Sequence, residues 1–228
     1  MPVFRILFSL LFLLSGWSVT AQPRTAAFYN VENFFDTGND PASDDGDFTP
    51  EGRYRWDVNR FVEKRGRIAQ VLGEIGADLV GLAEVENYIV LDSLIAEPVM
   101  QDLDYNYIHF DSPDPRGIDV ALLYRRSTFR PEAARAVRYA RLPHYRTREI
   151  LHASGHWRGH PVHVLVCHLP SVLSSGTVRE AAARSVGELA DSLLAADPDH
   201  LLLVMGDFNA NPGSRVLNRL TRGRRLTN

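Results

Sequence analysis

Apolar residues recur along the chain in two spacings, one typical of strands and one typical of helices. The strongest strand signal is Leu201–Met205, five apolar residues in a row that lead into Gly206-Asp207-Phe208-Asn209. Such a run predicts a strand buried on both faces, with polar side chains presented at its carboxyl end. Comparable runs predict strands at Thr25–Tyr29, Asp78–Ala83 and Val162–His168.

Helical spacing is clearest between Asp57 and Gly76, where apolar residues repeat every three or four positions. Asp57 is the expected N-cap of this helix and Gly76 its C-cap. Thr177-Val-Arg-Glu180 has the pattern of a capping box and predicts a second long helix to about Ala196. Shorter helices are expected at Leu91–Met100 and from Val216 to Leu220.

The remaining segments predict strands of lower regularity and one long loop. Antiparallel strands are expected at Asn106–Phe110 and Ile118–Tyr124, with further strand structure at Phe129–Arg141 and Arg148–Leu151. Residues Thr37–Gly52 are rich in Asp, Gly and Pro and predict a solvated loop without the acidic spacing of an EF-hand. There are no internal repeats or low-complexity tracts, so one domain is expected.

The first 21 residues have the pattern of a secretory signal peptide. One arginine precedes a mostly apolar stretch, and small residues end at Ala21, so the mature domain is expected to cover residues 22–228. No second apolar run is long enough for a membrane anchor. Cys167, the single cysteine, excludes an intramolecular disulfide. The predicted location is periplasmic or extracellular.

Composition narrows the function classes only a little. Of the 228 residues, 45% are hydrophobic, and the formal net charge of −3 argues against a protein that coats nucleic acid by bulk electrostatics. Lys64 is the only lysine among 25 basic residues. Arginine favours bidentate phosphate contacts, but a coding bias explains the same skew and is the preferred interpretation.

The chemistry lies in the polar residues that end the apolar strands. Glu84 ends one strand and is a candidate ligand for a hard divalent cation. Strand alternation places the side chain of Glu86 on the same face, so Glu86 is an alternative ligand. His168 and Asp207 end two other strands, and Asn209 follows Asp207. The sequence has no phosphate-binding loop, no G-x-S-x-G elbow and no H-E-x-x-H helix. An oxygen-rich set with one imidazole suits Mg²⁺ or Mn²⁺ and phosphoester hydrolysis.

The ordered motifs resemble those of the endonuclease/exonuclease/phosphatase superfamily, which includes deoxyribonuclease I, and in particular its secreted bacterial members. The resemblance rests on Asn30-Val-Glu-Asn, Gly81-Leu-Ala-Glu84-Val-Glu-Asn, Gly117-Ile-Asp-Val-Ala-Leu-Leu-Tyr, Thr147-Arg148-Glu-Ile-Leu, Cys167-His168-Leu-Pro-Ser and Gly206-Asp207-Phe-Asn209. It implies an α/β fold, a four-layered α/β/β/α sandwich with two packed mixed β-sheets.

The resemblance also implies a role for each matching residue. Asn30 and Glu84 would bind the divalent metal. Arg148 would contact substrate phosphate, with Arg146 as the alternative. The catalytic residues would be His168 at the phosphoryl group or leaving oxygen, Asp207 at the attacking water, and Asn209 at a phosphate oxygen.

One departure from the family pattern concerns the carboxyl end. Members of the family carry a final strand-end Asp-His pair, and nothing after Asn209 in this sequence supplies it. The sequence therefore predicts a C-terminally incomplete domain that lacks the closing strands. The first hypothesis is a metal-dependent phosphoesterase acting on nucleic acid, a nucleotide or another phosphoester. The alternative is an exported non-catalytic binding protein, or an inactive fragment of such an enzyme.

Overall fold

The structure, a computed structural model, describes residues 23–221 and 226. Two four-stranded sheets account for the strands, in the orders β1-β2-β4-β3 and β5-β6-β7-β8. Both sheets are mixed, because β1–β2 and β7–β8 are parallel pairs and the other neighbours are antiparallel. The strands are β1 (Ala26–Phe34), β2 (Leu79–Val85), β3 (Tyr105–His109), β4 (Asp119–Arg125), β5 (Phe129–Val137), β6 (Ile150–Trp157), β7 (His160–His168) and β8 (Leu201–Asp207).

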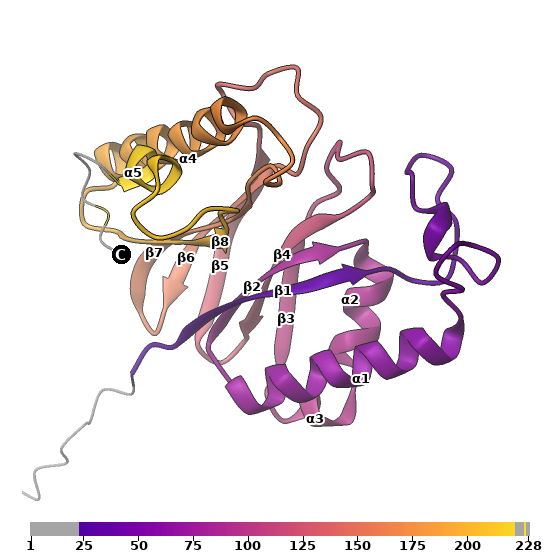
Figure 1. Cartoon of the computed structure of the whole chain (residues 1–228). Helices are drawn as coiled ribbons and strands as arrows, with labels where there is room; N and C mark the ends of the chain where they lie inside the picture. Colours follow the sequence, from indigo (N-terminus) through magenta and orange to yellow (C-terminus); the bar gives the residue numbers. More distant parts are fainter. Residues whose placement is uncertain (1–22, 222–225, 227–228) are drawn as a thin grey trace, which may run out of the picture.

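The helices form the two outer layers, which confirms the four-layered α/β/β/α sandwich expected from the sequence (Figure 1). One group packs on the β1-β2-β4-β3 sheet and the other on the β5-β6-β7-β8 sheet. They are α1 (Val58–Ile75), α2 (Tyr88–Ile95), α3 (Pro98–Gln101), α4 (Gly176–Ala196) and α5 (Arg215–Thr221), with a short 3₁₀ helix, η1 (Gly46–Phe48), before α1.

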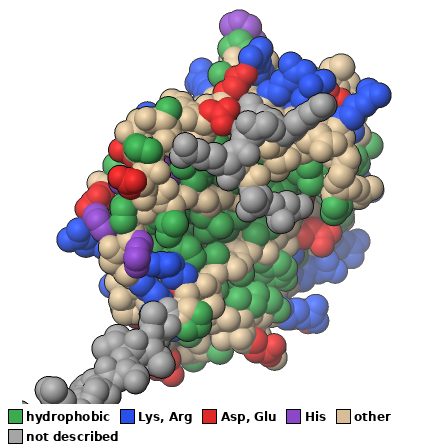
Figure 2. Space-filling view, turned by 90° about the vertical axis from the view of Figure 1, so that its left-hand side faces the viewer, with side chains coloured by type: hydrophobic (Ala, Val, Ile, Leu, Met, Phe, Trp, Pro, Cys, Tyr) green, Lys and Arg blue, Asp and Glu red, His purple; other side chains and the backbone are tan. Residues whose placement is uncertain are grey.

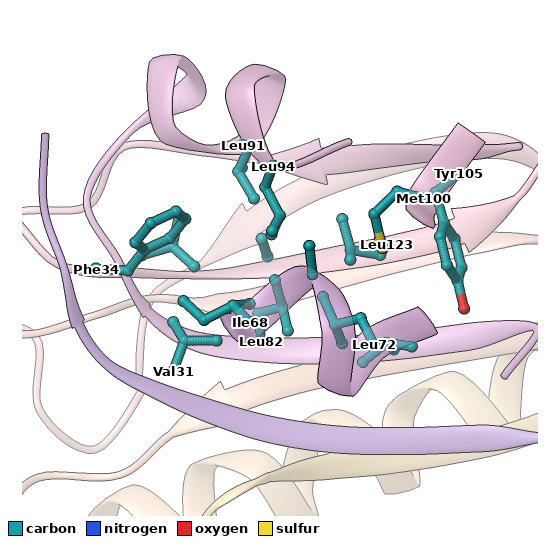
Figure 3. Packing of buried hydrophobic residues seen from close by; sticks show 14 of the residues in the cluster. Val31, Phe34, Ile68, Leu72, Leu82, Leu91, Leu94, Met100, Tyr105 and Leu123 are labelled. Atoms are coloured by element: carbon teal, nitrogen blue, oxygen red, sulfur yellow. The ribbon is translucent and has the colours of Figure 1, made fainter. Parts of the chain in front are cut away.

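Three apolar clusters hold these layers together. The first joins α1 and α2 to the first sheet, and Figure 3 shows Leu91 and Leu94 of α2 pointing toward the side chains of Ile68 and Leu82. The second lies between the sheets and includes Leu122 and Val164. The third joins the second sheet to α4 and α5. Alternate residues of a strand enter different clusters because successive side chains point to opposite faces of the sheet.

The caps predicted for α1 are confirmed, whereas the cap predicted for α4 is wrong. The Asp57 carboxylate accepts a hydrogen bond from the backbone N–H of Arg60, and Gly76 ends the helix with a φ of 52°. At α4 the cap is Ser175, whose hydroxyl accepts from the N–H of Val178. The helix therefore begins before Thr177, because a serine two residues earlier caps the same first turn.

Two predicted boundaries also change. The first strand does not end at Tyr29 but continues through Asn30 to Phe34. The helix expected at Leu91–Met100 is two helices, since α2 ends at Ile95 and Pro98 opens α3. Proline lacks a backbone N–H and fits the first turn of a helix but not its interior, so the chain restarts there.

The prediction that Leu201–Met205 is buried on both faces is wrong. Within β8 only Met205 is buried, and Leu201 is 43% exposed. Among the described residues β8 pairs with β7 alone, so one edge and part of its faces stay open. Figure 2 shows hydrophobic side chains gathered on this side of the molecule, at the left of Figure 1.

The predicted signal peptide, residues 1–21, lies outside the described residues. In the part of the chain that the structure covers, no helix is both long enough and apolar enough to span a bilayer.

Candidate active site

The polar strand ends meet where the two sheets face each other. Asn30 of β1 pairs in register with Ala83, next to Glu84 of β2, and His168 of β7 pairs with Asp207 of β8. Because both pairs are parallel, each delivers its two side chains to one edge of its sheet. Packing of the sheets then brings the two edges together.

Irregular backbone shapes the β1–β2 half of the site. The register of β1 against β2 shifts between Asn30 and Phe34, and β2 shifts against β4 on either side of Glu84. Glu84 has a φ of 65°, an unusual left-handed conformation for a glutamate that costs on the order of 1–3 kcal/mol. The backbone N–H of Asn33 donates to Glu84 Oε2 over 2.9 Å and holds the carboxylate in place. Strain of this kind is concentrated at functional sites.

One amide joins the two sheets. Asn30 Nδ2 donates to Glu84 Oε1 over 3.3 Å and to Asp207 Oδ2 over 3.1 Å. Its other atom, Oδ1, accepts from the backbone N–H of Glu32 over 2.8 Å. Carboxylates contributed by different sheets therefore converge on a single side chain.

Asp207 is held at both oxygens. Oδ2 accepts from Asn30, and Oδ1 accepts from the backbone N–H of Asn209 over 2.9 Å. Asn209 has a φ of 45°, which asparagine tolerates better than most residues. Its Nδ2 donates to the carbonyl of Leu169 over 3.0 Å. At Gly206, a Cβ would lie 2.0 Å from the carbonyl oxygen of Cys167, so the close approach of β8 to β7 requires glycine.

His168 lies beside Asp207 in the interior. Its Nε2 is 3.8 Å from Asp207 Oδ2, longer than a hydrogen bond, and the side chain is 3% exposed. Burial, reinforced by the nearby positive charge of Arg148, lowers the pKa of His168 well below its usual range. The imidazole is therefore neutral at pH 7. Its buried Nδ1 has no hydrogen-bond partner among the described residues.

Arg148 is an interior residue in this structure. Its Nη1 forms a buried ion pair with Asp114 Oδ2 over 2.9 Å, and its Nη2 donates to the carbonyl of Leu169 over 3.0 Å. Arg148 and Asn209 thus share the Leu169 carbonyl, which connects the arginine to the Asp207 loop. The alternative residue, Arg146, is exposed and donates to the carbonyl of Pro113 over 3.2 Å.

The structure separates Glu84 from Glu86. Glu86 is buried and accepts from the backbone N–H of Asp36 over 2.6 Å, in a region lined by Asp40, Asn87 and Asp119. Simple strand alternation would have placed the two glutamates on the same side. The left-handed residue at Glu84 breaks that alternation, so only Glu84 reaches Asn30.

Two residues near the site were not among the site residues predicted from the sequence. Lys64 of α1 lines a hollow of about 540 Å³ together with Asn30 and Glu32. Burial lowers the pKa of Lys64, while the charges of Glu32 and Glu84 raise it in partial opposition. Its being the only lysine was a usable signal. Asp114, the partner of Arg148, lies in a loop where no periodicity marks it.

The donor set fits a hard divalent cation. The side-chain atoms of Asn30 and Glu84 lie 3.3 Å apart, close to the spacing of about 3 Å between neighbouring ligands of Mg²⁺ with bonds of about 2.1 Å. The amide would have to turn over to present Oδ1, since nitrogen faces the carboxylate here. Carboxylate and amide oxygens are the ligands that Mg²⁺ and Mn²⁺ prefer.

The chain belongs to the Endonuclease/Exonuclease/phosphatase family, whose profile matches residues 25–225. This confirms the family expected from the ordered motifs. A search of curated proteins found no match.

Solved structures share the fold. A family member from Bacteroides thetaiotaomicron is 19% identical, with a TM-score of 0.61 over 87% of this chain and 68% of that one. The human Nocturnin catalytic domain with bound sulfate anion is 20% identical, with a TM-score of 0.57 over 71% of this chain and 62% of that one. D. rerio TDP2 complexed with single strand DNA product is 14% identical, with a TM-score of 0.58 over 86% and 64% of the two chains. The match with Nocturnin thus spans less than two thirds of that domain.

Proposed function

We propose that this protein is a divalent-metal-dependent phosphoester hydrolase that uses an Asp207-activated water. The observation that carries the proposal is the Asn30 amide, which bonds to Glu84 of one sheet and Asp207 of the other. Two carboxylates this close repel each other unless a cation or a donor lies between them. This arrangement suits a metal-assisted hydrolase, in which one carboxylate holds the ion and the other activates the water.

Each residue then has a distinct task. The backbone N–H of Asn209 fixes the Asp207 carboxylate at Oδ1. Its Oδ2, which accepts from Asn30 in this structure, would become free for water once the Asn30 amide turns over toward the metal. A carboxylate so oriented acts as general base and is worth roughly 10²–10⁴-fold in rate. Neutral His168 has one N–H to donate toward the phosphoryl group or leaving oxygen.

Asn30 and Glu84 would hold Mg²⁺ or Mn²⁺, which supplies Lewis-acid polarisation of the phosphoryl oxygen. Arg148 is assigned to the phosphate-binding wall, acting through the Leu169 carbonyl that it shares with Asn209. Lys64 adds a positive charge beside Glu84 for a further phosphate oxygen.

The proposed substrate class is a phosphodiester of nucleic acid or a nucleotide. The single strand DNA product bound by the structurally similar D. rerio TDP2 supports this choice. The hollow that Asn30, Arg60 and Lys64 line offers basic side chains beside the proposed metal site. Export of the mature protein, predicted from the first 21 residues, is part of the same proposal.

The test is hydrolysis of plasmid DNA and of a chromogenic phosphodiester by the purified chain, with Mg²⁺, with Mn²⁺ or with a chelator. We expect activity that disappears on chelation and returns with added metal. Glu84→Ala should reduce the rate about 100-fold or more while thermal unfolding stays cooperative, because a partly exposed ligand contributes little to the core.

The matched control is Glu74→Ala, which removes an exposed carboxylate of α1 far from the strand ends. Wild-type rates in Glu84→Ala would show that the metal assignment is wrong. A well-folded chain that hydrolyses neither substrate with either metal would instead favour the non-catalytic alternative.

A further inference from the structure

A second group of metal-ligating side chains lies at the opposite end of β7 and β8. His163 of β7, Asp197 at the C-cap of α4 and His200 just before β8 direct side-chain atoms toward one point. His163 precedes His168 by five strand residues, which places the cluster about 16 Å along the strand from the candidate active site. The cluster is therefore separate from Asn30 and Glu84.

The spacing of the three atoms is that of a small tetrahedral site. His163 Nε2 is 3.1 Å from Asp197 Oδ2 and 3.1 Å from His200 Nδ1, and all three atoms lie within 4.8 Å of one another. Ligands of tetrahedral zinc, with bonds of about 2.0–2.1 Å, lie about 3.3 Å apart. His163 Nε2 carries at most one proton, so it cannot form full hydrogen bonds to both neighbours at once.

The solvent exposure of the group and the contacts of its buried histidine also suit a metal ion. His163 is buried at 4% exposure, whereas Asp197 and His200 are partly exposed and open the group to solvent. His163 Nδ1 lies 3.1 Å from Nε2 of the buried His152, which fixes the imidazole ring as supporting residues do at metal sites.

We propose that His163, Asp197 and His200 form a second metal site, which takes Zn²⁺ or a similar borderline transition metal, with water as its fourth ligand. Two imidazoles and one carboxylate are a ligand set for zinc rather than for magnesium. By joining β7 to the α4–β8 connection, the ion stabilises the second sheet at the end away from the active site.

Arg135 affects the position of the proton between His152 and His163, which gives a further test of the proposal. Its Nε donates to His152 Nδ1 over 3.3 Å, which leaves the His152 proton on Nε2, facing His163 Nδ1. A metal on His163 Nε2 requires the opposite order, with His163 Nδ1–H donating to His152 Nε2. The exposed Arg135 must then turn away from His152. Removing Arg135 should therefore tighten metal binding, an effect that a purely structural histidine cluster does not produce.

The test is calorimetric titration of untagged, metal-free protein with Zn²⁺ in saturating Mg²⁺, which occupies the oxygen-rich site. We expect one Zn²⁺ per chain, about tenfold or more weaker binding in Asp197→Ala and in His200→Ala, and several-fold tighter binding in Arg135→Ala. The Glu84→Ala protein should bind Zn²⁺ as the wild type does. Co²⁺ added in place of Zn²⁺ should show the visible absorption of a tetrahedral site.

His160→Ala is the matched control, because it removes an exposed histidine of the same strand outside the cluster. Unchanged Zn²⁺ affinity in both Asp197→Ala and His200→Ala would overturn the proposal. An equal loss of Zn²⁺ affinity in His160→Ala would also overturn the proposal, since it would show that zinc binds surface histidines at random.

Discussion

The strands β2 and β8 look alike in sequence but differ in their surroundings. Both are apolar runs that end in a carboxylate, Glu84 in one and Asp207 in the other. β2 lies between β1 and β4, and all but one of its residues are buried. β8 pairs with β7 alone among the described residues, and only one of its residues is buried.

An apolar run therefore shows that a strand can be buried, but the neighbouring strands and helices determine whether it is. The difference between β2 and β8 also separates the two halves of the candidate site. Glu84 projects from a covered sheet through a strained backbone, whereas Asp207 projects from a partly open edge and relies on Asn30 and Asn209 for its orientation.

The largest effect is expected from removing the two carboxylates one at a time. Asp207→Asn should lower kcat about 1,000-fold, because an amide cannot accept the proton of the attacking water. Glu84→Gln should lower the rate less, and higher Mg²⁺ or Mn²⁺ should recover part of it, because this change weakens binding of the metal. Steady-state rates at several metal concentrations separate the two responses.

If added metal restored the rate of Asp207→Asn, the assignment of metal binding to Glu84 and water activation to Asp207 would be wrong. Circular dichroism and thermal unfolding of both variants serve as the control for folding.

Next in size is the difference in stability between matched leucines. Leu82 of β2 is fully buried in the first apolar cluster, and Leu202 of β8 is only partly buried. Leu82→Ala should lower the free energy of unfolding by about 3 kcal/mol, and Leu202→Ala by about 1 kcal/mol. Urea unfolding of the two variants measures both values. Equal losses would show that β8 is as well covered as β2.

Much of the fold follows from the sequence, because local rules were sufficient for it. The apolar runs placed β2, β7 and β8, and helical spacing with its caps placed α1. What sequence could not supply depends on contacts between distant segments. The exposure of β8 is set by its neighbours, and Ser175 could be recognised as the cap of α4 only from its hydrogen bond to Val178.

The candidate site also has features that the sequence predicted and features that depend on contacts between distant segments. Asn30, Glu84, His168 and Asp207 were expected in one site because the ordered motifs resemble those of a family in which the matching residues share a site. The structure brings the four residues together. Arg148 was assigned to substrate phosphate, yet its ion pair with Asp114 depends on a loop 34 residues away. Glu86 remained an alternative to Glu84, because a left-handed residue inside a strand leaves no periodic mark.

The smallest expected effect tests how the end of β2 sorts Glu84 from Glu86. Burial, together with the charges of Asp36, Asp45 and Asp40, raises the pKa of Glu86 to about 8, although the N–H of Asp36 partly opposes the shift. The folded protein therefore holds this proton more tightly than the unfolded chain does. The resulting stability is fully present below pH 4.5 and is lost as the pH rises through about 8.

Glu86→Gln removes this titration and keeps an oxygen to accept the N–H of Asp36. The free energy of unfolding of the variant should therefore rise relative to that of the wild type between pH 5 and pH 9. The difference should be on the order of 2 kcal/mol at the alkaline end. Urea unfolding across this range, with exposed Glu51→Gln as control, measures the gain. Parallel curves for variant and wild type would mean that Glu86 is ionised in the folded protein. The end of β2 would then offer two charged carboxylates, and the preference for Glu84 as metal ligand would rest on its contact with Asn30 alone.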